Sequence, residues 1–333
     1  MRKFGNTGME IKRVGFGGIP IQRISQDDTN KVIDELEKCG VNFIDTARGY
    51  TISEEYLGNA LKGRREKFYI ATKSMSRDYE SMKRDIEISL KNLQTDYIDL
   101  YQMHNVKPAE YDTIFGEDRA YRALEVKEAG KIKHIGITSH GLETVEKAVE
   151  SGKFETIQFP YNIVENQADE VFKKAHEKGV GTIVMKPLAG GAIDDGTLAM
   201  KYILSREYID VAIPGMDTPE QVRENTAVLA NFELTEEDNV KITKIKSELG
   251  TNFCRRCEYC LPCPQGVIIP QNFLLEGYYT RYGLQDWAID RYKALGEDQR
   301  ASNCVECGAC ESKCPYELPI IEMLKNVVNT LEK

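Results

Sequence analysis

The chain has 333 residues, of which 41% are hydrophobic and 29% are charged, a balance typical of a globular protein with one or two domains. Its formal net charge of −9 argues against a nucleic-acid partner or an anionic membrane surface, because either would require a basic face. No apolar run approaches the roughly 20 residues of a membrane-spanning helix, and the charged N-terminus lacks a signal-peptide core. We therefore expect a cytoplasmic protein without membrane insertion.

Residues 1–230 alternate between short apolar, β-branched runs and longer stretches with helical spacing. The opening segment "KFGNTGMEI" predicts a hairpin that turns at Asn6–Gly8. Continuous apolar runs such as "TIVM" are typical of strands buried on both faces of a parallel sheet. The eight candidate strands are, in chain order, Arg13–Gly17, Asn42–Thr46, Phe68–Thr72, Tyr97–Met103, His134–Thr138, Thr156–Phe159, Gly181–Met185 and Val211–Ile213.

Helical patterns lie between these strands. The first, "DDTNKVIDELEKCG", opens with an Asp/Thr capping signal and ends at Gly40. Strands that alternate with helices form either a doubly wound sheet or a closed barrel. The count of eight strands over residues 1–230 favours an α/β fold of the (β/α)8 TIM-barrel type, whose bottom the hairpin is expected to close.

One further helix is predicted over residues 233–250, ending at Gly250. Beyond it the alternation stops, and cysteine, proline and aromatic residues dominate. We therefore predict a barrel domain over residues 1–250 and a second, small α-helical domain over residues 251–333.

Eight of the nine cysteines fall in two tight groups within this second domain, and only Cys39 stands apart. A disulfide framework is not expected in a large chain without a secretion signal, so the grouping points to metal. The groups are Cys254-x₂-Cys257-x₂-Cys260-x₂-Cys263-Pro264 and Cys304-x₂-Cys307-x₂-Cys310-x₃-Cys314-Pro315. The second group has the spacing of bacterial ferredoxins, which predicts a ferredoxin-like domain with two [4Fe–4S] clusters.

The spacing also predicts which cysteines share a cluster. Three thiolates at intervals of three residues can hold three corners of one cubane, while the fourth, before a proline, ligates the other cluster. We assign one cluster to Cys254, Cys257, Cys260 and Cys314, and the other to Cys304, Cys307, Cys310 and Cys263. The first group has one residue fewer before its last cysteine, which bears mainly on Cys263. A pair of structural zinc sites is the alternative, since C-x₂-C pairs also bind zinc. With either metal, the few apolar residues around these motifs predict a domain that needs the metal to fold.

Polar residues follow three successive strands of the predicted barrel. Asp45, Lys73 and His104 come at the ends of the second, third and fourth strands, and Tyr50 lies in the loop after Asp45. Active sites of such barrels lie at the C-terminal ends of the strands. A phenol is a poor acid at neutral pH unless a neighbouring ammonium lowers its pKa, and a carboxylate can hold that ammonium in place. The four residues therefore predict a proton-transfer site.

Residues 1–230 resemble the aldo-keto reductase family. The segments that carry the resemblance are "FIDTARGY" (43–50), "ATKS" (71–74), "DLYQMH" (99–104), "IGITSH" (135–140), "IQFPYN" (157–162), "MKPLAGG" (185–191) and "IPGMDTPEQVREN" (213–225). The resemblance implies that Asp45, Tyr50, Lys73 and His104 are a catalytic tetrad, with Tyr50 as proton donor to a substrate carbonyl. With its tail, the chain is similar to the subgroup of these reductases that carries a ferredoxin-like extension.

The same resemblance implies a site for NADPH or NADH. Its residues are Thr138, Ser139, Gln158, Met185, Pro187, Leu188, Gly215, Glu224 and Asn225. Met185 replaces the tyrosine that stacks on the nicotinamide in the family. Gly215 and Gln221 stand where the family has a lysine and an arginine for the 2′-phosphate, so the preference between the two nucleotides stays open. Arg223 or Lys186 would be the replacement cations.

The expected activity is the NAD(P)H-dependent reduction of an aldehyde, ketone or quinone, coupled to or regulated by the two clusters. A nicotinamide delivers two electrons as a hydride and a cluster moves one, a mismatch that a flavin usually bridges. The sequence has no G-x-G-x-x-G motif, but a barrel can bind flavin without one, so flavin is neither indicated nor excluded. The clusters could exchange electrons with a redox partner protein, or they could be structural or oxygen-sensing. A third alternative is an electron-transfer or redox-sensing protein on a modified barrel. The loop of residues 105–120 is expected to set substrate specificity.

Overall fold

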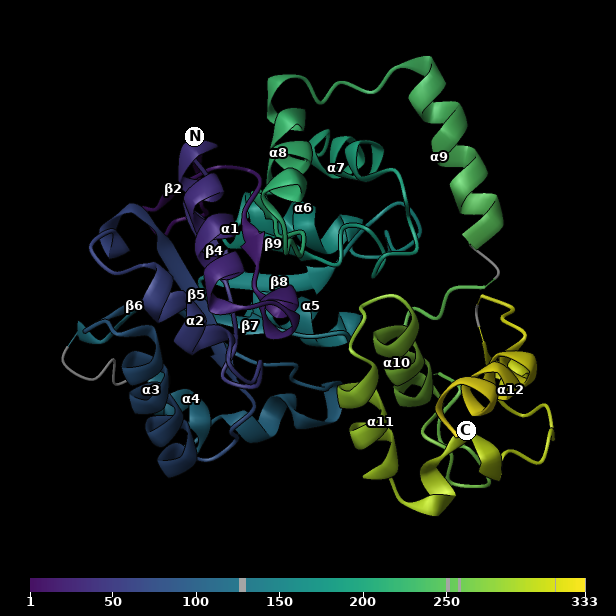
Figure 1. Cartoon of the computed structure of the whole chain (residues 1–333). Helices are drawn as coiled ribbons and strands as arrows, with labels where there is room; N and C mark the ends of the chain where they lie inside the picture. The colour runs from purple at the N-terminus through teal and green to yellow at the C-terminus, as the bar shows by residue number, and fades with distance from the viewer. Residues whose placement is uncertain (126–129, 250–251, 257–258, 315, 333) are drawn as a thin grey trace. The chain divides into compact units, whose positions relative to one another are not determined.

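The computed structural model describes residues 1–125, 130–249, 252–256, 259–314 and 316–332 (Figure 1). It separates into two compact units. One comprises Met1–Leu188 and Asp195–Leu234, and the other comprises Ala189–Asp194 and Thr235–Lys333. Helix α9 (Glu236–Leu249), which lies before the expected boundary near residue 250, thus groups with the second unit. The boundary near 250 stays a prediction.

The first unit is built on eight parallel strands. They are β3 (Phe16–Gly17), β4 (Phe43–Asp45), β5 (Tyr69–Ser74), β6 (Ile98–Met103), β7 (Ile132–Thr138), β8 (Thr156–Pro160), β9 (Gly181–Met185) and β10 (Val211–Ala212). They pair in chain order, and parallel bridges from Val14 to Ala212 and from Gly17 to Gly215 join the first strand to the last. The predicted (β/α)8 barrel is therefore confirmed, and each predicted strand overlaps one observed strand.

In the described part of this unit, α-helices lie around these strands (Figure 1). They are α1 (Gln26–Lys38), α2 (Ser53–Ala60), α3 (Tyr79–Leu93), α4 (Ala120–Glu125), α5 (Leu142–Ser151), α6 (Asp169–Glu177), α7 (Gly196–Leu204) and α8 (Pro219–Ala227). The sequence sets their starts. The side chains of Ser25, Asp78, Asp195 and Thr218 each accept a hydrogen bond from the first turn of the helix that follows.

The N-terminal hairpin closes the N-terminal end of the barrel. Its strands β1 (Arg2–Lys3) and β2 (Glu10–Ile11) pair antiparallel, as predicted. Phe4, between them, is fully buried among barrel side chains that include Phe43 at the start of β4. Gly5 has a φ of +48°, and a Cβ there would lie 2.4 Å from the Gly181 amide nitrogen, so only glycine fits. The opposite, C-terminal end of the strands is left for a site.

The second unit is helical. Besides α9 it contains α10 (Ile269–Thr280), α11 (Gln285–Lys293) and α12 (Ile320–Leu331), with short 3-10 turns that include η7 (Ala301–Asn303) and η8 (Glu311–Lys313). Its core combines apolar residues of α10 to α12 with two cysteines, Cys260 and Cys310. The predicted small α-helical domain is confirmed. Across the described parts of both units, no helix is long and apolar enough to cross a membrane.

Candidate active site and cluster-binding loops

Asp45 and Lys73 form a buried ion pair at the C-terminal end of the barrel. Asp45 is the last residue of β4, and Lys73 lies on the neighbouring β5. The Lys73 Nζ donates hydrogen bonds to Asp45 Oδ1 at 2.5 Å and to the Thr46 carbonyl at 2.7 Å. Gln102 Nε2 donates to the second carboxylate oxygen of Asp45 at 3.1 Å. Asp45 and Lys73 are 2% and 1% exposed, so water contributes almost nothing to holding these charges.

Burial and pairing act on this ion pair in opposite directions. Burial raises the pKa of Asp45 and lowers the pKa of Lys73, because each charged form loses its water. Their mutual attraction opposes both shifts, and hydrogen bonds from Gln102 and Gln158 also favour the Asp45 carboxylate. The charge of each partner therefore depends on the other.

Tyr50 and His104 lie beside this pair. The Lys73 Nζ is 5.1 Å from the centroid of the Tyr50 ring, and the Tyr50 and His104 rings meet edge to face with centroids 5.9 Å apart. Tyr50 is held in a tight turn, because its amide donates to the Ala47 carbonyl at 3.0 Å. The structure thus brings together the four residues that the strand ends predict, with Lys73 next to the phenol.

His104 is a neutral imidazole in this setting. Burial, followed by the charges of Lys73 and Arg77, holds its pKa well below the ordinary value. Its Nδ1 is buried and has no hydrogen-bond partner among the described residues. A neutral ring at pH 7 can donate one hydrogen bond without introducing a second positive charge beside Lys73.

The depressed pKa of His104 predicts a pH dependence of stability. The unfolded chain binds this proton near pH 6.5 while the folded chain does not, so stability is lost as the pH falls below that value. Between pH 8 and pH 5.5 the expected loss is about 1 kcal/mol, and His104→Gln should remove this part of the dependence. Urea unfolding followed by circular dichroism measures it. His176→Gln, at an exposed histidine, is the matched control and should behave like the wild type. Parallel pH profiles for wild type and His104→Gln would contradict the prediction.

Three of the predicted cofactor residues lie on or beside β7 and β8. Thr138 and Gln158 are direct neighbours across these strands. The Gln158 side-chain oxygen is buried and has no hydrogen-bond partner within the described part of the chain. An orphaned acceptor of this kind fits the amide of a nicotinamide carboxamide. The Ser139 hydroxyl, by contrast, already donates to the Val106 carbonyl at 2.6 Å and accepts from the Gly141 amide at 2.9 Å.

Met185 and Gly215 lie at and just beyond the C-terminal ends of β9 and β10. Met185 is the last residue of β9 and is half-buried. A Cβ on Gly215 would lie 2.8 Å from the Pro20 side chain, so a larger residue does not fit without a shift. Arg223 pairs with Glu35 at 3.2 Å and also with Glu220. Position 215 therefore supplies no positive charge, and the positive charge of Arg223 is already paired with two carboxylates.

The remaining predicted cofactor residues are placed as follows. Pro187 is buried and Leu188 half-buried in the segment after β9. Asn225 is buried on α8 and donates to the Gln221 carbonyl at 2.8 Å, while Glu224 is exposed. The Lys186 backbone has a φ of +55°, and its carbonyl accepts from the Asn162 side chain at 3.1 Å.

The cysteine loops repeat one backbone feature. Arg256 and Glu306 precede the second cysteine of their groups, and both have a φ of +57°. A cavity in the second unit is lined by Cys254, Cys260 and Cys314, three of the four residues assigned to one cluster. The fourth, Cys257, lies outside the described residues, as does Pro315. The same cavity is lined by Arg255, which is buried and lies 4.1 Å from the centroid of the Tyr316 ring.

The cysteines of the other assigned cluster differ in exposure. Cys310 is buried in the core, Cys263 and Cys304 are half-buried against it, and Cys307 is exposed. These thiols fit an iron–sulfur group in their chemistry, since thiolates are the ligands of such clusters.

Metal loss is expected to unfold the second unit and leave the barrel folded. Cys260 and Cys310 lie in the core of that unit and Cys254, Cys263, Cys304 and Cys314 pack against it, so clusters would tie this core together. The only tryptophan of the chain, Trp287 on α11, packs against Tyr278 with centroids 5.0 Å apart, so its fluorescence reports on this unit alone. Oxidative cluster removal with a chelator should shift the emission to the red while most of the circular dichroism signal persists.

Cys254→Ser should produce the same red shift without chelator. Cys39→Ser, at the end of α1, is the matched control and should not. Unchanged emission after complete metal removal would contradict the prediction, and metal analysis of the purified protein separates iron from the zinc alternative.

Two residues of the site were missed by sequence reasoning. Gln102 stands two positions before His104 on β6, and the two-residue period of a strand places both side chains on the same face. That signal could have found it. The other is Arg77, whose Nη2 donates to the His104 carbonyl at 2.9 Å and which no pattern in the sequence indicates.

The first unit is thus a closed parallel barrel with a polar site at the C-terminal ends of its strands. Residues 13–197 match the Aldo/keto reductase family, and residues 253–319 match a 4Fe-4S dicluster domain. The chain therefore belongs to the aldo/keto reductase family and is an oxidoreductase that carries an iron–sulfur domain at its C-terminal end.

Relatives and solved structures agree with this assignment. The chain is 27% identical over 301 residues to the L-galactose dehydrogenase of Arabidopsis thaliana, covering 75% of this chain and 94% of that protein. It is 26% identical over 309 residues to the NADH-specific methylglyoxal reductase of Escherichia coli, covering 70% and 94%. An aldo-keto reductase of Bacillus halodurans in its holo form superposes with a TM-score of 0.62 at 27% identity, covering 73% of this chain and 95% of that one.

Proposed function

We propose that this protein reduces a small aldehyde, ketone or quinone with NADH or NADPH, and that Tyr50 donates the proton. The observation that supports this most is the buried Lys73–Asp45 pair beside the Tyr50 ring, with the neutral imidazole of His104 in edge-to-face contact with the same ring. Carbonyl reduction requires a proton donor, a charge that favours the donor's anion and a neutral hydrogen-bond donor close to one another, and Tyr50, Lys73 and His104 supply those groups.

Each residue has a distinct part in this proposal. The Lys73 ammonium, 5.1 Å from the phenol ring, stabilises the phenolate that remains when Tyr50 gives its proton to the substrate oxygen. Asp45 and the Thr46 carbonyl hold Lys73 in place. His104 donates a hydrogen bond that orients the carbonyl. A bound nicotinamide supplies the hydride, and the Gln158 oxygen is a suitable acceptor for its carboxamide.

The second unit completes the proposal with two [4Fe–4S] clusters. Cys254, Cys257, Cys260 and Cys314 hold one, and Cys304, Cys307, Cys310 and Cys263 hold the other. The cavity shared by the first, third and fourth of these cysteines supports the crossed pairing, because Cys314 is distant in sequence from its partners. The clusters either exchange single electrons with a redox partner protein, or have a structural or oxygen-sensing role.

The experiment that tests the proposal is an anaerobic visible spectrum with iron and sulfide analysis, followed by titration with NADH and NADPH. Turnover is then assayed with 4-nitrobenzaldehyde and with a quinone. Nucleotide oxidation with either substrate supports the reductase. Bleaching of the cluster band by nucleotide alone would show that electrons pass from the nicotinamide to the clusters. A bridging flavin would then be sought.

A second candidate function is electron transfer or redox sensing on a modified barrel. The observation that favours it is the altered nucleotide site, with Met185 at the platform position and no room for a side chain at Gly215. Full clusters in a protein that binds neither nucleotide and reduces no carbonyl would support this function over the reductase.

A further inference from the structure

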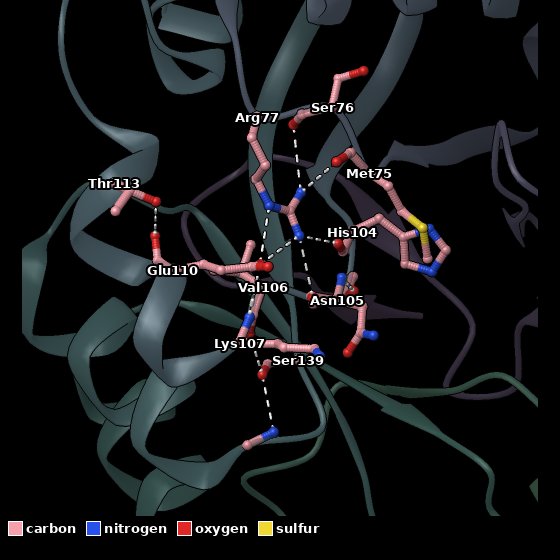
Figure 2. A network of polar contacts seen from close by, with 12 residues as sticks. Met75, Ser76, Arg77, His104, Asn105, Val106, Lys107, Glu110, Thr113 and Ser139 are labelled. Atoms are coloured by element: carbon pink, nitrogen blue, oxygen red, sulfur yellow. Dashed lines mark hydrogen bonds and ion pairs between the residues drawn. The ribbon is translucent and has the colours of Figure 1, made fainter. Parts of the chain in front are cut away.

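Arg77 joins the loops that follow two neighbouring barrel strands (Figure 2). It lies three residues past the end of β5, and its Nη1 donates to the carbonyls of Met75 at 3.0 Å and Ser76 at 3.4 Å. Its Nη2 donates to the carbonyls of His104 at 2.9 Å and Asn105 at 3.2 Å, just past β6. One guanidinium therefore binds four backbone carbonyls from two loops.

The same residue holds both ends of the loop of residues 105–120. Near its start, the Glu110 carboxylate in η3 (Pro108–Ile114) accepts from Arg77 Nε at 3.1 Å and from the Lys107 amide at 3.3 Å. At its far end, the Ala120 amide donates to the Arg77 carbonyl at 3.1 Å. The two ends of the loop that we expect to contact the substrate are thus held together at Arg77, one by its side chain and the other by its backbone carbonyl.

His104 depends on this arrangement because its ring lacks the usual anchor. A histidine is commonly oriented by a hydrogen bond to its second nitrogen, but the buried Nδ1 of His104 has no such partner in the described ranges. The His104 amide donates to the Ser74 carbonyl at 2.9 Å, and Asn105 then turns the chain with a φ of +49°. The amides of Asn105 and Val106 donate to Thr138 at 2.8 and 2.9 Å, which leaves the carbonyls of His104 and Asn105 to Arg77. The carbonyls that Arg77 binds are those of this turn.

We propose that Arg77 is a positioning residue for the reduction. It fixes the backbone of His104 and holds the two ends of the 105–120 loop together. The proposal rests on the function proposed above for His104. Arginine suits this task because its planar fork directs five N–H donors in fixed directions, whereas a lysine ammonium is a single point of charge. Displacing a catalytic group by about 1 Å can lower the rate about 100-fold.

The test compares Arg77→Ala and Arg77→Lys with Arg84→Ala, a matched control at an exposed arginine of the adjacent helix. With 4-nitrobenzaldehyde and NADH, Arg77→Ala should lower kcat by about 100-fold, and nucleotide affinity should change less than about twofold. Added guanidinium chloride should restore part of that kcat, since the side chain is 26% exposed, and methylammonium should not. Arg77→Lys keeps the charge and should still lose most of the rate. Arg84→Ala should match the wild type.

An NMR measurement separates this proposal from the function on which it rests. The chain has four histidines, and the ring signals of His104 can be assigned with His104→Gln in histidine-labelled protein. These signals should move in Arg77→Ala and Arg77→Lys and stay in place in Arg84→Ala. If the wild type reduces no carbonyl, the reductase fails and the NMR result still decides the role of Arg77. Two results for Arg77→Ala would overturn the positioning role. One is unmoved His104 signals with an unchanged kcat. The other is a loss of kcat that guanidinium does not restore and that parallels a general loss of stability.

Discussion

Replacing Tyr50 by phenylalanine is expected to abolish carbonyl reduction and to leave the iron content and the fold unchanged. The phenol oxygen is the only atom removed, and proton donation by a positioned side chain contributes roughly 10²–10⁴-fold to a rate. The ring remains, so the edge-to-face contact with His104 and the approach of the Lys73 ammonium to its face are kept. Nucleotide binding should therefore persist in a protein that no longer turns over.

The measurement is NADH oxidation with 4-nitrobenzaldehyde, together with iron analysis and a nucleotide titration of the same sample. Tyr56→Phe is the matched control, because Tyr56 is a half-buried tyrosine on the helix that follows the same loop. Its activity should equal that of the wild type. A Tyr50→Phe protein as active as the wild type would show that the proton comes from another group and end the proposed mechanism.

The barrel and its polar site could be predicted because both depend on local pattern. Apolar runs of β-branched residues mark strands that are buried on both faces, and the C-terminal ends of parallel strands meet at one edge. That rule alone predicts the positions of Asp45, Lys73 and His104. Tyr50 is predictable as well, since it follows Asp45 by five residues in a tight loop.

The interactions that support the site could not be predicted, because they join distant segments through backbone atoms. Arg77 binds carbonyls whose directions depend on the left-handed turn at Asn105, and no residue type announces such a partner. The crowding of Gly215 by Pro20 is equally hidden, since the two are 195 positions apart in sequence. Cysteine spacing predicts the cluster domain, but not that Cys310 is buried among residues of α10 to α12 while Cys307 is exposed.

Replacing Lys73 by methionine is expected to destabilise the barrel by about 3–5 kcal/mol and to abolish reduction. The substitution keeps the length of the side chain but leaves the Asp45 carboxylate buried without its counter-ion, which is the costly way to break a buried pair. The remaining donors to Asp45 come from neutral amides such as Gln102, which do not replace a full positive charge.

The pH dependence of this variant has a definite sign. Burial raises the pKa of Asp45, and without Lys73 the main opposing influence is gone. As the pH falls, the folded variant therefore takes up a proton at Asp45 before the unfolded chain does, whose aspartate titrates near pH 3.9. A carboxyl group whose folded pKa is raised contributes stability that is lost as the pH rises above the unfolded value. Urea unfolding should therefore show a smaller deficit relative to the wild type at pH 5.5 than at pH 8.

A second substitution separates stability from catalysis. In Lys73→Met/Asp45→Asn both charges are absent, so no uncompensated charge is buried and most of the lost stability should return, since replacing both members of a buried pair is often near neutral. Activity should not return, because the ammonium that favours the Tyr50 phenolate is still missing. A double variant that recovers activity along with stability would mean that the pair serves only the fold. A Lys73→Met protein as stable as the wild type at pH 8 would mean that Asp45 is already protonated in the native barrel, and that no ion pair exists there.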